Sequence, residues 1–151
     1  MLCERRGKRM TVRCLAYGSQ AYRAELELRD EVLRRPLGLS IWDDCREGEE
    51  EEIHLGAFAG EALIGTLILT PGEGLWRMRQ VAVRPGRQGK GVGRKLAEFG
   101  EALARERGAR GIYLHARETA RGFYERCGYR AVGEEFLERG IPHVEMEKRF
   151  G

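Results

Sequence analysis

Three glycines at every second position, Gly89, Gly91 and Gly93, give residues 80–96 the strongest chemical signal in the sequence. An apolar segment precedes them, and an amphipathic helical pattern follows. Glycines lack a Cβ atom, so a ligand can approach the backbone closely. The first N–H groups of a helix have no intrahelical partner and lie at the positive end of its dipole. Four basic residues crowd this junction: Arg87, Lys90, Arg94 and Lys95. The stretch therefore predicts a phosphate or pyrophosphate site.

Two common kinds of phosphate-binding loop do not fit this stretch. A P-loop places Ser or Thr directly after its Gly-Lys pair to bind Mg²⁺, whereas Gly91 follows Lys90 here. A dinucleotide-binding loop needs a third glycine at the position that Arg94 occupies. A merely flexible basic turn does not explain the strand-like segment before the loop and the helical pattern after it.

A fourth interpretation fits the residues best. Residues 88–93 (QGKGVG) resemble the Q/R-x-x-G-x-G/A signature of the GNAT superfamily of acyl-CoA-dependent N-acyltransferases. Residues 81–83 (VAV) stand where these proteins carry an apolar strand end, and residues 123–129 (FYERCGY) resemble their FYxxxGF/Y element. The resemblance runs from about residue 63 to the C-terminus, and residues 140–144 (GIPHV) also look like an uncharacterised bacterial branch of the superfamily.

The resemblance implies a mixed sheet whose fourth and fifth strands, residues 75–83 and 111–116, are parallel, splay apart and are flanked by helices. A splayed pair leaves backbone groups unpaired, and in this family the pantetheine arm of acetyl-CoA pairs with them. The pyrophosphate would bind the N–H groups of residues 88–94, with Arg84, Arg87 and Lys90 near the outer phosphates. The implied coenzyme A contacts are Val81, Ala82, Val83, Arg87, Gln88, Gly89, Lys90, Gly91, Val92, Gly93 and Arg94.

Tyr124 matches the tyrosine that GNAT enzymes commonly place near the sulfur of the cofactor. The resemblance therefore implies that Tyr124 protonates the leaving thiolate, a role that suits a phenol with an unperturbed pKa near ~10. The alternative is that Tyr124 is a core aromatic, since Phe123 and Tyr129 flank it.

The general base does not transfer from the family. Some branches carry a glutamate on the strand before the loop, where this chain has Arg77, and Arg117 stands where an asparagine is common. We name His115 as the candidate base, with a partly buried structural histidine as the alternative. His143, Glu135 and a water chain to the backbone are further candidates.

The implied reaction is the transfer of an acetyl group from acetyl-CoA to a primary amine by direct attack in a ternary complex. The alternative is a non-catalytic acyl-CoA-binding or regulatory module on the same fold. The expected partner is a small-molecule or peptide amine, and the sequence does not identify it. Dimerisation through the C-terminal strands is expected only by analogy.

The elements that must position these residues follow from hydrophobic periodicity. Strand-like segments alternate with two strongly helical ones, which predicts an α/β or α+β architecture around one mixed sheet. We expect strands at 10–16, 53–59, 62–70, 75–83 and 111–116, with two short strands near the C-terminus. A helix should start after Ser19 and end at Pro36 and Gly38, and a second should bury Val92, Leu96, Phe99 and Leu103. A third helix should carry Tyr124 and a core Cys127. We expect residues 39–52 to form an irregular, exposed loop in which the Glu49–Glu52 run is solvated.

Composition narrows the class of protein. The chain has 151 residues, 42% of them apolar and 34% charged, which predicts one globular domain over residues 10–151 after a loose extension at 1–9. The net charge of +3 is too small to favour nucleic-acid binding. No apolar segment is long enough for a signal peptide or a membrane span, and the four cysteines lack metal-ligand spacing. We therefore expect a cytoplasmic protein with reduced thiols, no resident metal and no membrane partner.

Overall fold

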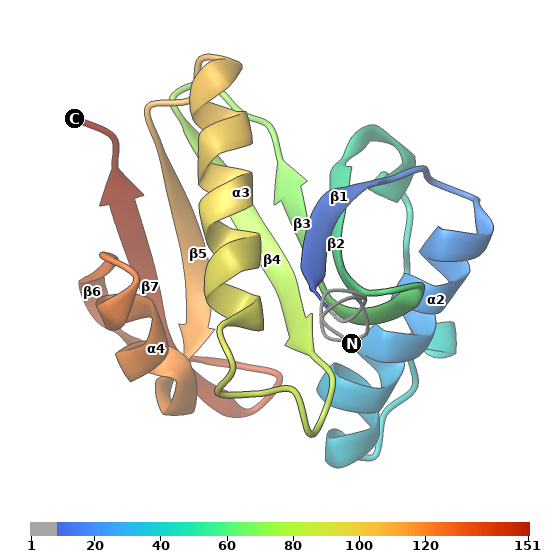
Figure 1. Ribbon diagram of the computed structural model, residues 1–151. Coiled ribbons are helices and arrows are strands. Elements are labelled where there is room, and N and C mark those ends of the chain that lie inside the picture. Colours follow the sequence, from blue (N-terminus) through green and yellow to red (C-terminus); the bar gives the residue numbers. More distant parts are fainter. Residues whose placement is uncertain (1–8) are drawn as a thin grey trace. The chain divides into compact units, whose positions relative to one another are not determined.

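The computed structural model describes residues 9–151, so eight of the nine residues of the expected N-terminal extension lie outside the described part. Seven strands form one mixed sheet in the order β1-β2-β3-β4-β5-β7-β6 (Figure 1). The strands are β1 Met10–Leu15, β2 Ile53–Ala59, β3 Ala62–Thr70, β4 Leu75–Val83, β5 Gly111–Arg117, β6 Arg130–Glu138 and β7 Ile141–Arg149. The α-helices are α2 Gln20–Arg29, α3 Val92–Glu106 and α4 Arg121–Arg126. This architecture confirms the predicted mixed sheet with flanking helices.

The chain divides into two compact units, which we describe separately. The first unit contains the chain up to Leu69 together with Gln80–Gly100, and the second contains Thr70–Arg79 together with Glu101–Gly151. The boundaries fall before the last residue of β3, inside β4 and inside α3. No helix within residues 9–151 is long and apolar enough to cross a membrane.

In the first unit, β1, β2 and β3 form an antiparallel meander. Gly60, with φ +62°, makes the turn of the β2–β3 hairpin, as its place between two apolar runs predicts. The Ser19 side chain caps α2 by accepting a hydrogen bond from the backbone N–H of Tyr22. Leu28 of this helix packs into a core cluster with Leu15, Phe58 and Leu63.

The first helix changes its hydrogen-bonding pattern before it ends. Regular α-helical hydrogen bonding stops at Arg29, and a wide π-type turn, Asp30–Arg34, follows before a 3₁₀ turn that contains Pro36. The carboxylate of Asp30, the first residue of this turn, accepts hydrogen bonds from the backbone N–H of Ile41 and from Arg35. The helical segment still stops at Gly38, which has φ +72°.

The expectation of an irregular, exposed loop over residues 39–52 is wrong at two short turns and at two buried residues. Two 3₁₀ turns, Ile41–Asp43 and Glu49–Glu51, occupy the segment, and Ile41 and Glu49 are 0% and 2% exposed. Glu49 is buried because the guanidinium of Arg29 pairs with its carboxylate. The run of four glutamates therefore contains one buried member with a partner elsewhere in the chain.

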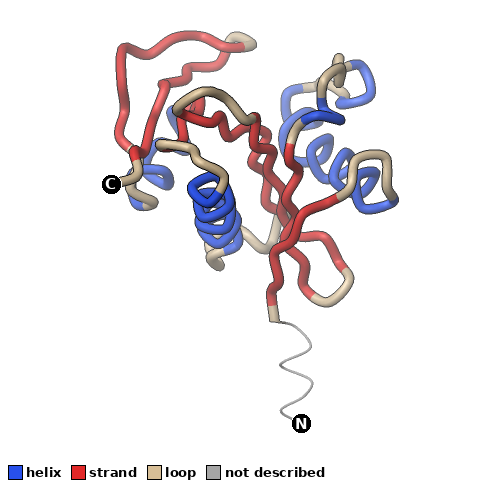
Figure 2. The backbone as a smooth tube through the Cα atoms, turned by 90° about the horizontal axis from the view of Figure 1, so that it is seen from above, coloured by secondary structure: helices blue, strands red, loops and turns tan. Residues whose placement is uncertain are grey.

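In the second unit, β4 and β5 pair in parallel through Leu75–Arg77 and Gly111–Tyr113. β5 then pairs along its whole length with the antiparallel strand β7. β6 and β7 form a hairpin whose turn contains Arg139 and Gly140, both with positive φ (Figure 2). Each strand of this hairpin has nine residues, so it is longer than the short strands that we expected.

The buried face of α3 differs from the prediction in two respects. Val92 and Leu96 are buried as expected, but Leu103 is only partly buried. Phe99 is 38% exposed, and its neighbour Gly100 is buried instead. A Cβ atom on Gly100 would lie 3.4 Å from a methyl of Leu55, so this side of the helix is closely packed in the first unit. A bulky aromatic side chain would not fit at position 100.

Candidate functional site

The glycine-rich loop between β4 and α3 exposes its backbone. Gly86, Gly89 and Gly91 have φ angles of +90°, +77° and +86°, values that residues with a Cβ atom rarely adopt. No atom of the protein lies within 4 Å of the position that a Cβ would take on Gly89 or Gly91. The space above the loop is therefore open to a ligand.

The start of α3 concentrates positive charge. The first turn contains no acidic residue, and Arg87, Lys90, Arg94 and Lys95 are all exposed around it. Cations at a helix N-terminus oppose the helix dipole, so this arrangement is unfavourable until an anion neutralises it. The first helical backbone hydrogen bond that the structure gives runs from Lys95 N–H to Gly91 O at 3.0 Å. The preceding N–H groups lie in the first turn, where a helix has no acceptor for them.

Side chains at the base of the loop hold its shape. Gln88 donates from Nε2 to the carbonyl of Val83 at 3.2 Å. Arg84 donates to the carbonyl of Leu63 from two nitrogens, at 2.9 and 3.1 Å, and pairs with Glu31 at 3.3 Å. Arg84, which we expected beside the outer phosphates, is thus engaged with the protein, whereas Arg87 and Lys90 extend from the exposed loop.

The end of β4 bends before the loop. Gln80 has φ +55°, an unusual conformation for a residue with a side chain, and such strain clusters at functional sites. The parallel pairing with β5 covers only the first third of β4 and ends at Arg77. Ala82 is buried, while Val81 and Val83 are half-buried.

Tyr124 lies in α4 of the second unit and is 8% exposed. Its ring contacts those of Phe123 and Tyr129 edge-on, with centroids 5.0 and 5.8 Å away. Burial raises the pKa of the Tyr124 hydroxyl, and the neighbouring Cys127 raises it further. The hydroxyl therefore keeps its proton at neutral pH. Cys127, which we expected in the core, is partly exposed.

His115 lies on β5 with its side chain 25% exposed, between two carboxylates. Its Nδ1 atom is 3.1 Å from Glu138 Oε1, and its Nε2 atom is 3.6 Å from Glu145 Oε1. Phe136 contacts the ring edge-on at 5.2 Å. Arg77, on β4, places Nη2 3.4 Å from Nδ1.

His143, the second candidate base, joins the same cluster. It is buried, with Nδ1 2.7 Å from the carbonyl of Ile141 and Nε2 3.8 Å from Glu138 Oε2. Glu135, the third candidate, is exposed. Sequence reasoning missed Glu138, although the Arg139-Gly140 turn would have placed it next to the histidine-bearing strand.

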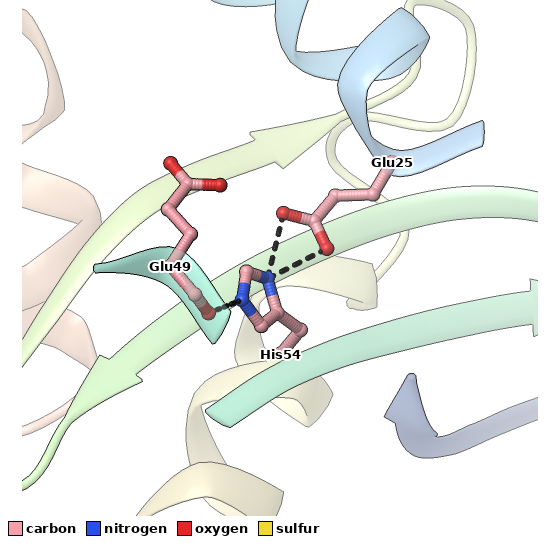
Figure 3. A group of neighbouring side chains, drawn as sticks. All are labelled: Glu25, Glu49 and His54. Carbon is pink, nitrogen blue, oxygen red and sulfur yellow. Dashed lines mark hydrogen bonds and ion pairs between the residues drawn. The ribbon is translucent and has the colours of Figure 1, made fainter. Parts of the chain in front are cut away.

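Sequence reasoning also missed a buried ionic network in the first unit. Arg29 donates from Nη2 to Glu49 Oε2 at 2.8 Å and from Nη1 to Glu25 Oε2 at 2.9 Å. His54 lies between the two glutamates (Figure 3), and Tyr22 donates its hydroxyl to Glu49 Oε1 at 2.7 Å. All five side chains are buried. Burial raises the pKa of Tyr22, and its bond to Glu49 adds to this effect.

Three members of this network, Glu25, Glu49 and His54, are close enough in space to hold a metal ion. Their ligand atoms are already occupied, however, because the guanidinium of Arg29 binds both carboxylates and both ring nitrogens of His54 face acceptors. A metal would have to displace Arg29, which is 1% exposed, and leave its charge buried without partners. The arrangement fits a structural network, not a metal centre.

Comparison with known proteins gives a consistent result. The family model described as an acetyltransferase (GNAT) domain matches residues 42–150. The uncharacterised N-acetyltransferase YjcF of Bacillus subtilis (strain 168) is 31% identical over 122 residues, which make up 80% of this chain and 87% of YjcF. A crystal structure of a protein assigned as an N-acetyltransferase from Lactobacillus plantarum has a TM-score of 0.82 at 30% identity and covers 93% of this chain and 97% of its own. An aminoglycoside 6'-N-acetyltransferase complexed with coenzyme A shares the fold, with a TM-score of 0.73 at 18% identity and coverage of 92% and 96%.

Proposed function

Because the chain belongs to the GNAT acetyltransferase family, we propose that it transfers an acetyl group from acetyl-CoA to a primary amine by direct attack in a ternary complex. The observation that carries this proposal is the open glycine loop at the cationic start of α3. Exposed backbone at Gly89 and Gly91, together with four basic side chains and no acidic residue in the first turn, suits a pyrophosphate.

The residues from Val81 to Arg94 are the proposed cofactor site. The N–H groups of residues 88–94 would bind the pyrophosphate, and Arg87 and Lys90 would neutralise its charge. The amides of the pantetheine arm would pair with the backbone of Val81 and Val83, next to the bend at Gln80. Support for this cofactor comes from the fold neighbour that was crystallised with coenzyme A.

When bound, acetyl-CoA supplies the acetyl group as a thioester. We assign two proton-transfer roles to this chain's own residues. Tyr124 holds a proton on its hydroxyl, because its pKa is raised, and would neutralise the thiolate that leaves. His115, partly exposed and beside two carboxylates, would take the proton of the attacking amine.

Binding of acetyl-CoA can be tested by thermal unfolding. A ligand at about 100 times its Kd adds about 2.7 kcal/mol to the free energy of unfolding, so millimolar acetyl-CoA should raise the Tm. Lys90→Glu and Arg87→Glu should reduce this shift, whereas Arg107→Glu, an equally exposed arginine beyond the other end of α3, should leave it unchanged. The absence of any shift in the wild type would contradict the proposal.

Turnover separates an enzyme from a non-catalytic acyl-CoA-binding module. We expect thiol release when acetyl-CoA is mixed with members of a broad panel of primary amines. A protein that binds acetyl-CoA but releases no thiol with any amine would favour the binding module.

A further inference from the structure

One face of the β5–β7 pair carries a row of polar residues opposite the apolar core. Ile112, Leu114 and Met146 are buried on one face, so residues alternating with them point to the other. There His115 is the cross-strand neighbour of Glu145. The β6–β7 hairpin adds Glu138 to this face, so that four strands of the second unit contribute to the cluster around His115.

Glu138 decides which ring nitrogen of His115 carries the proton. An ionised carboxylate only accepts hydrogen bonds, so the 3.1 Å contact to Oε1 requires a donor at Nδ1. Arg77 only donates and competes for the same nitrogen, but its contact is longer, at 3.4 Å. The bond to the anionic carboxylate is the stronger of the two. Neutral His115 therefore keeps its lone pair on Nε2.

A second imidazole lies on the other side of Glu138. Oε2 of Glu138 is 3.8 Å from Nε2 of His143, which is too far for a hydrogen bond, and His143 donates from Nδ1 to the carbonyl of Ile141 at 2.7 Å. Phe136 separates the two imidazoles, stacking on His143 and presenting its edge to His115. The hairpin thus places the Glu138 carboxylate beside both imidazoles, and its hydrogen bond is the one to His115.

Glu145 lies beside the nitrogen that remains free to accept a proton. Its Oε1 atom is 3.6 Å from Nε2 of His115, and its side chain is 44% exposed. A half-exposed carboxylate next to a basic lone pair suits an ammonium group. The titratable and charged groups that face His115 are Arg77, Tyr113, Glu138, His143 and Glu145.

We infer that Glu138 is a positioning residue that holds His115 in its Nδ1–H form, and that Glu145 binds the ammonium group of the acceptor before Nε2 deprotonates it. This inference rests on the proposed acetyl transfer. The ammonium nitrogen gives one proton to Nε2, which becomes imidazolium, and its freed lone pair forms the C–N bond as the C–S bond breaks. Tyr124 gives its hydroxyl proton to the leaving thiolate, a second proton leaves the same nitrogen and restores the Tyr124 hydroxyl through solvent, and the imidazolium releases its proton to solvent. The acceptor class is a primary amine that arrives as an ammonium ion.

The tautomer of His115 can be measured without turnover by ¹⁵N NMR of the imidazole rings. The wild type should show the Nδ1–H form. Glu138→Ala should convert His115 to the Nε2–H form, because Arg77 then becomes the partner of Nδ1, and Glu138→Asp should restore part of the original signal. Glu134→Ala, a substitution of an exposed residue on the same strand, should change nothing. An Nε2–H form in the wild type, or no change in Glu138→Ala, would overturn the inference.

Kinetics tests the same roles. Glu138→Ala should lower kcat at least about tenfold, because Nε2 of His115 then carries the proton and no longer accepts one. The KM for acetyl-CoA should stay unchanged. Glu145→Ala should raise the KM for the amine at least about fivefold, through loss of a charge-assisted contact. Glu134→Ala serves again as the matched control.

The outcomes distinguish the two proposals. If the wild type transfers acetyl groups and Glu138→Ala keeps its kcat and the Nδ1–H form of His115, the positioning role is wrong and the acetyltransferase activity stands. If the wild type transfers none to any amine, the proposed function fails, and the roles of Glu138 and Glu145 fail with it.

Discussion

Nδ1 of His54 lies 2.9 and 3.0 Å from the two carboxylate oxygens of Glu25, and both side chains are buried (Figure 3). The other ring nitrogen, Nε2, is 2.8 Å from the carbonyl of Glu49. Both partners only accept hydrogen bonds, so both ring nitrogens must donate, and His54 is an imidazolium. Its charge and that of Arg29 balance the two glutamates.

The stability of the protein should therefore depend on the protonation of His54. Burial alone lowers the pKa of His54, but the hydrogen bond and charge of Glu25, followed by those of Glu49, outweigh it and raise the pKa. A raised folded-state pKa adds stability that is complete below the unfolded value near ~6.5 and is lost as the pH rises through the folded value. We expect the advantage of the wild type over His54→Gln in urea unfolding to be largest at about pH 6 and to shrink at higher pH.

A comparison variant isolates this effect from the other titrations of the chain. Glu135→Gln lies on an exposed part of β6, so its stability difference from the wild type should not vary over the same pH range. An advantage over His54→Gln that grows with pH would show that His54 is neutral in the folded state.

Arg29 should contribute more to stability than an exposed arginine. Arg29→Met leaves Glu25 and Glu49 buried with one cation fewer, and breaking a buried ion pair costs about 3–5 kcal/mol. Arg23→Met breaks an exposed pair with Glu27 and should cost at most about 1 kcal/mol. Urea unfolding of the two variants measures the contrast, and equal losses would count against the network as a stabilising unit.

The sequence alone predicted the elements whose signals are local. The β2–β3 hairpin follows from two apolar runs around a glycine turn, and the start of α3 follows from helical periodicity after the glycine loop. The burial of Glu49 follows from a partner 20 residues away, Arg29. Periodicity carries no information about such pairs, so the sequence alone predicts that all four glutamates are exposed to solvent.

In the candidate site, too, features with a local sequence signal were predictable and features that depend on distant residues were not. The glycine loop was recognisable because its residue types are required by backbone conformation, as the positive φ angles of Gly89 and Gly91 show. Glu138 was not recognised, because its role depends on cross-strand register and on the direction of a side chain from a hairpin. Phe99 was misplaced because a helical pattern alone does not reveal that Gly100 lines the closely packed side of α3.

Gly65 should be intolerant of a side chain, although it lies in a regular strand. A Cβ atom there would be 2.8 Å from Val92 Cγ1 and 2.9 Å from Leu96 Cδ1 at the start of α3. Gly65→Ala should lower the free energy of unfolding by about 1–3 kcal/mol through overpacking. The measurement is urea unfolding of the variant against the wild type.

Gly100→Ala provides the matched comparison within α3. Its Cβ would meet methyl groups at 3.4–3.7 Å, which is ordinary contact, and Ala is favoured over Gly in a helix by about 1 kcal/mol. We expect Gly100→Ala to be neutral or stabilising. A loss as large as that of Gly65→Ala would mean that α3 packs as tightly at Gly100 as it does against Gly65.

Tyr124→Phe should separate binding from catalysis. The substitution removes only the hydroxyl from a side chain that is 8% exposed and packed between two aromatic rings, so the fold should persist. Without the proton that we assign to this hydroxyl, kcat should fall by at least about a hundredfold, the lower end of the range for general acid catalysis. Because the pKa of Tyr124 is raised, the wild type should show no loss of activity from ionisation of this phenol below pH 10. Thiol release measures kcat, and the Tm shift with acetyl-CoA should remain that of the wild type. An unchanged kcat would assign Tyr124 to the core and leave the thiolate to be protonated by solvent.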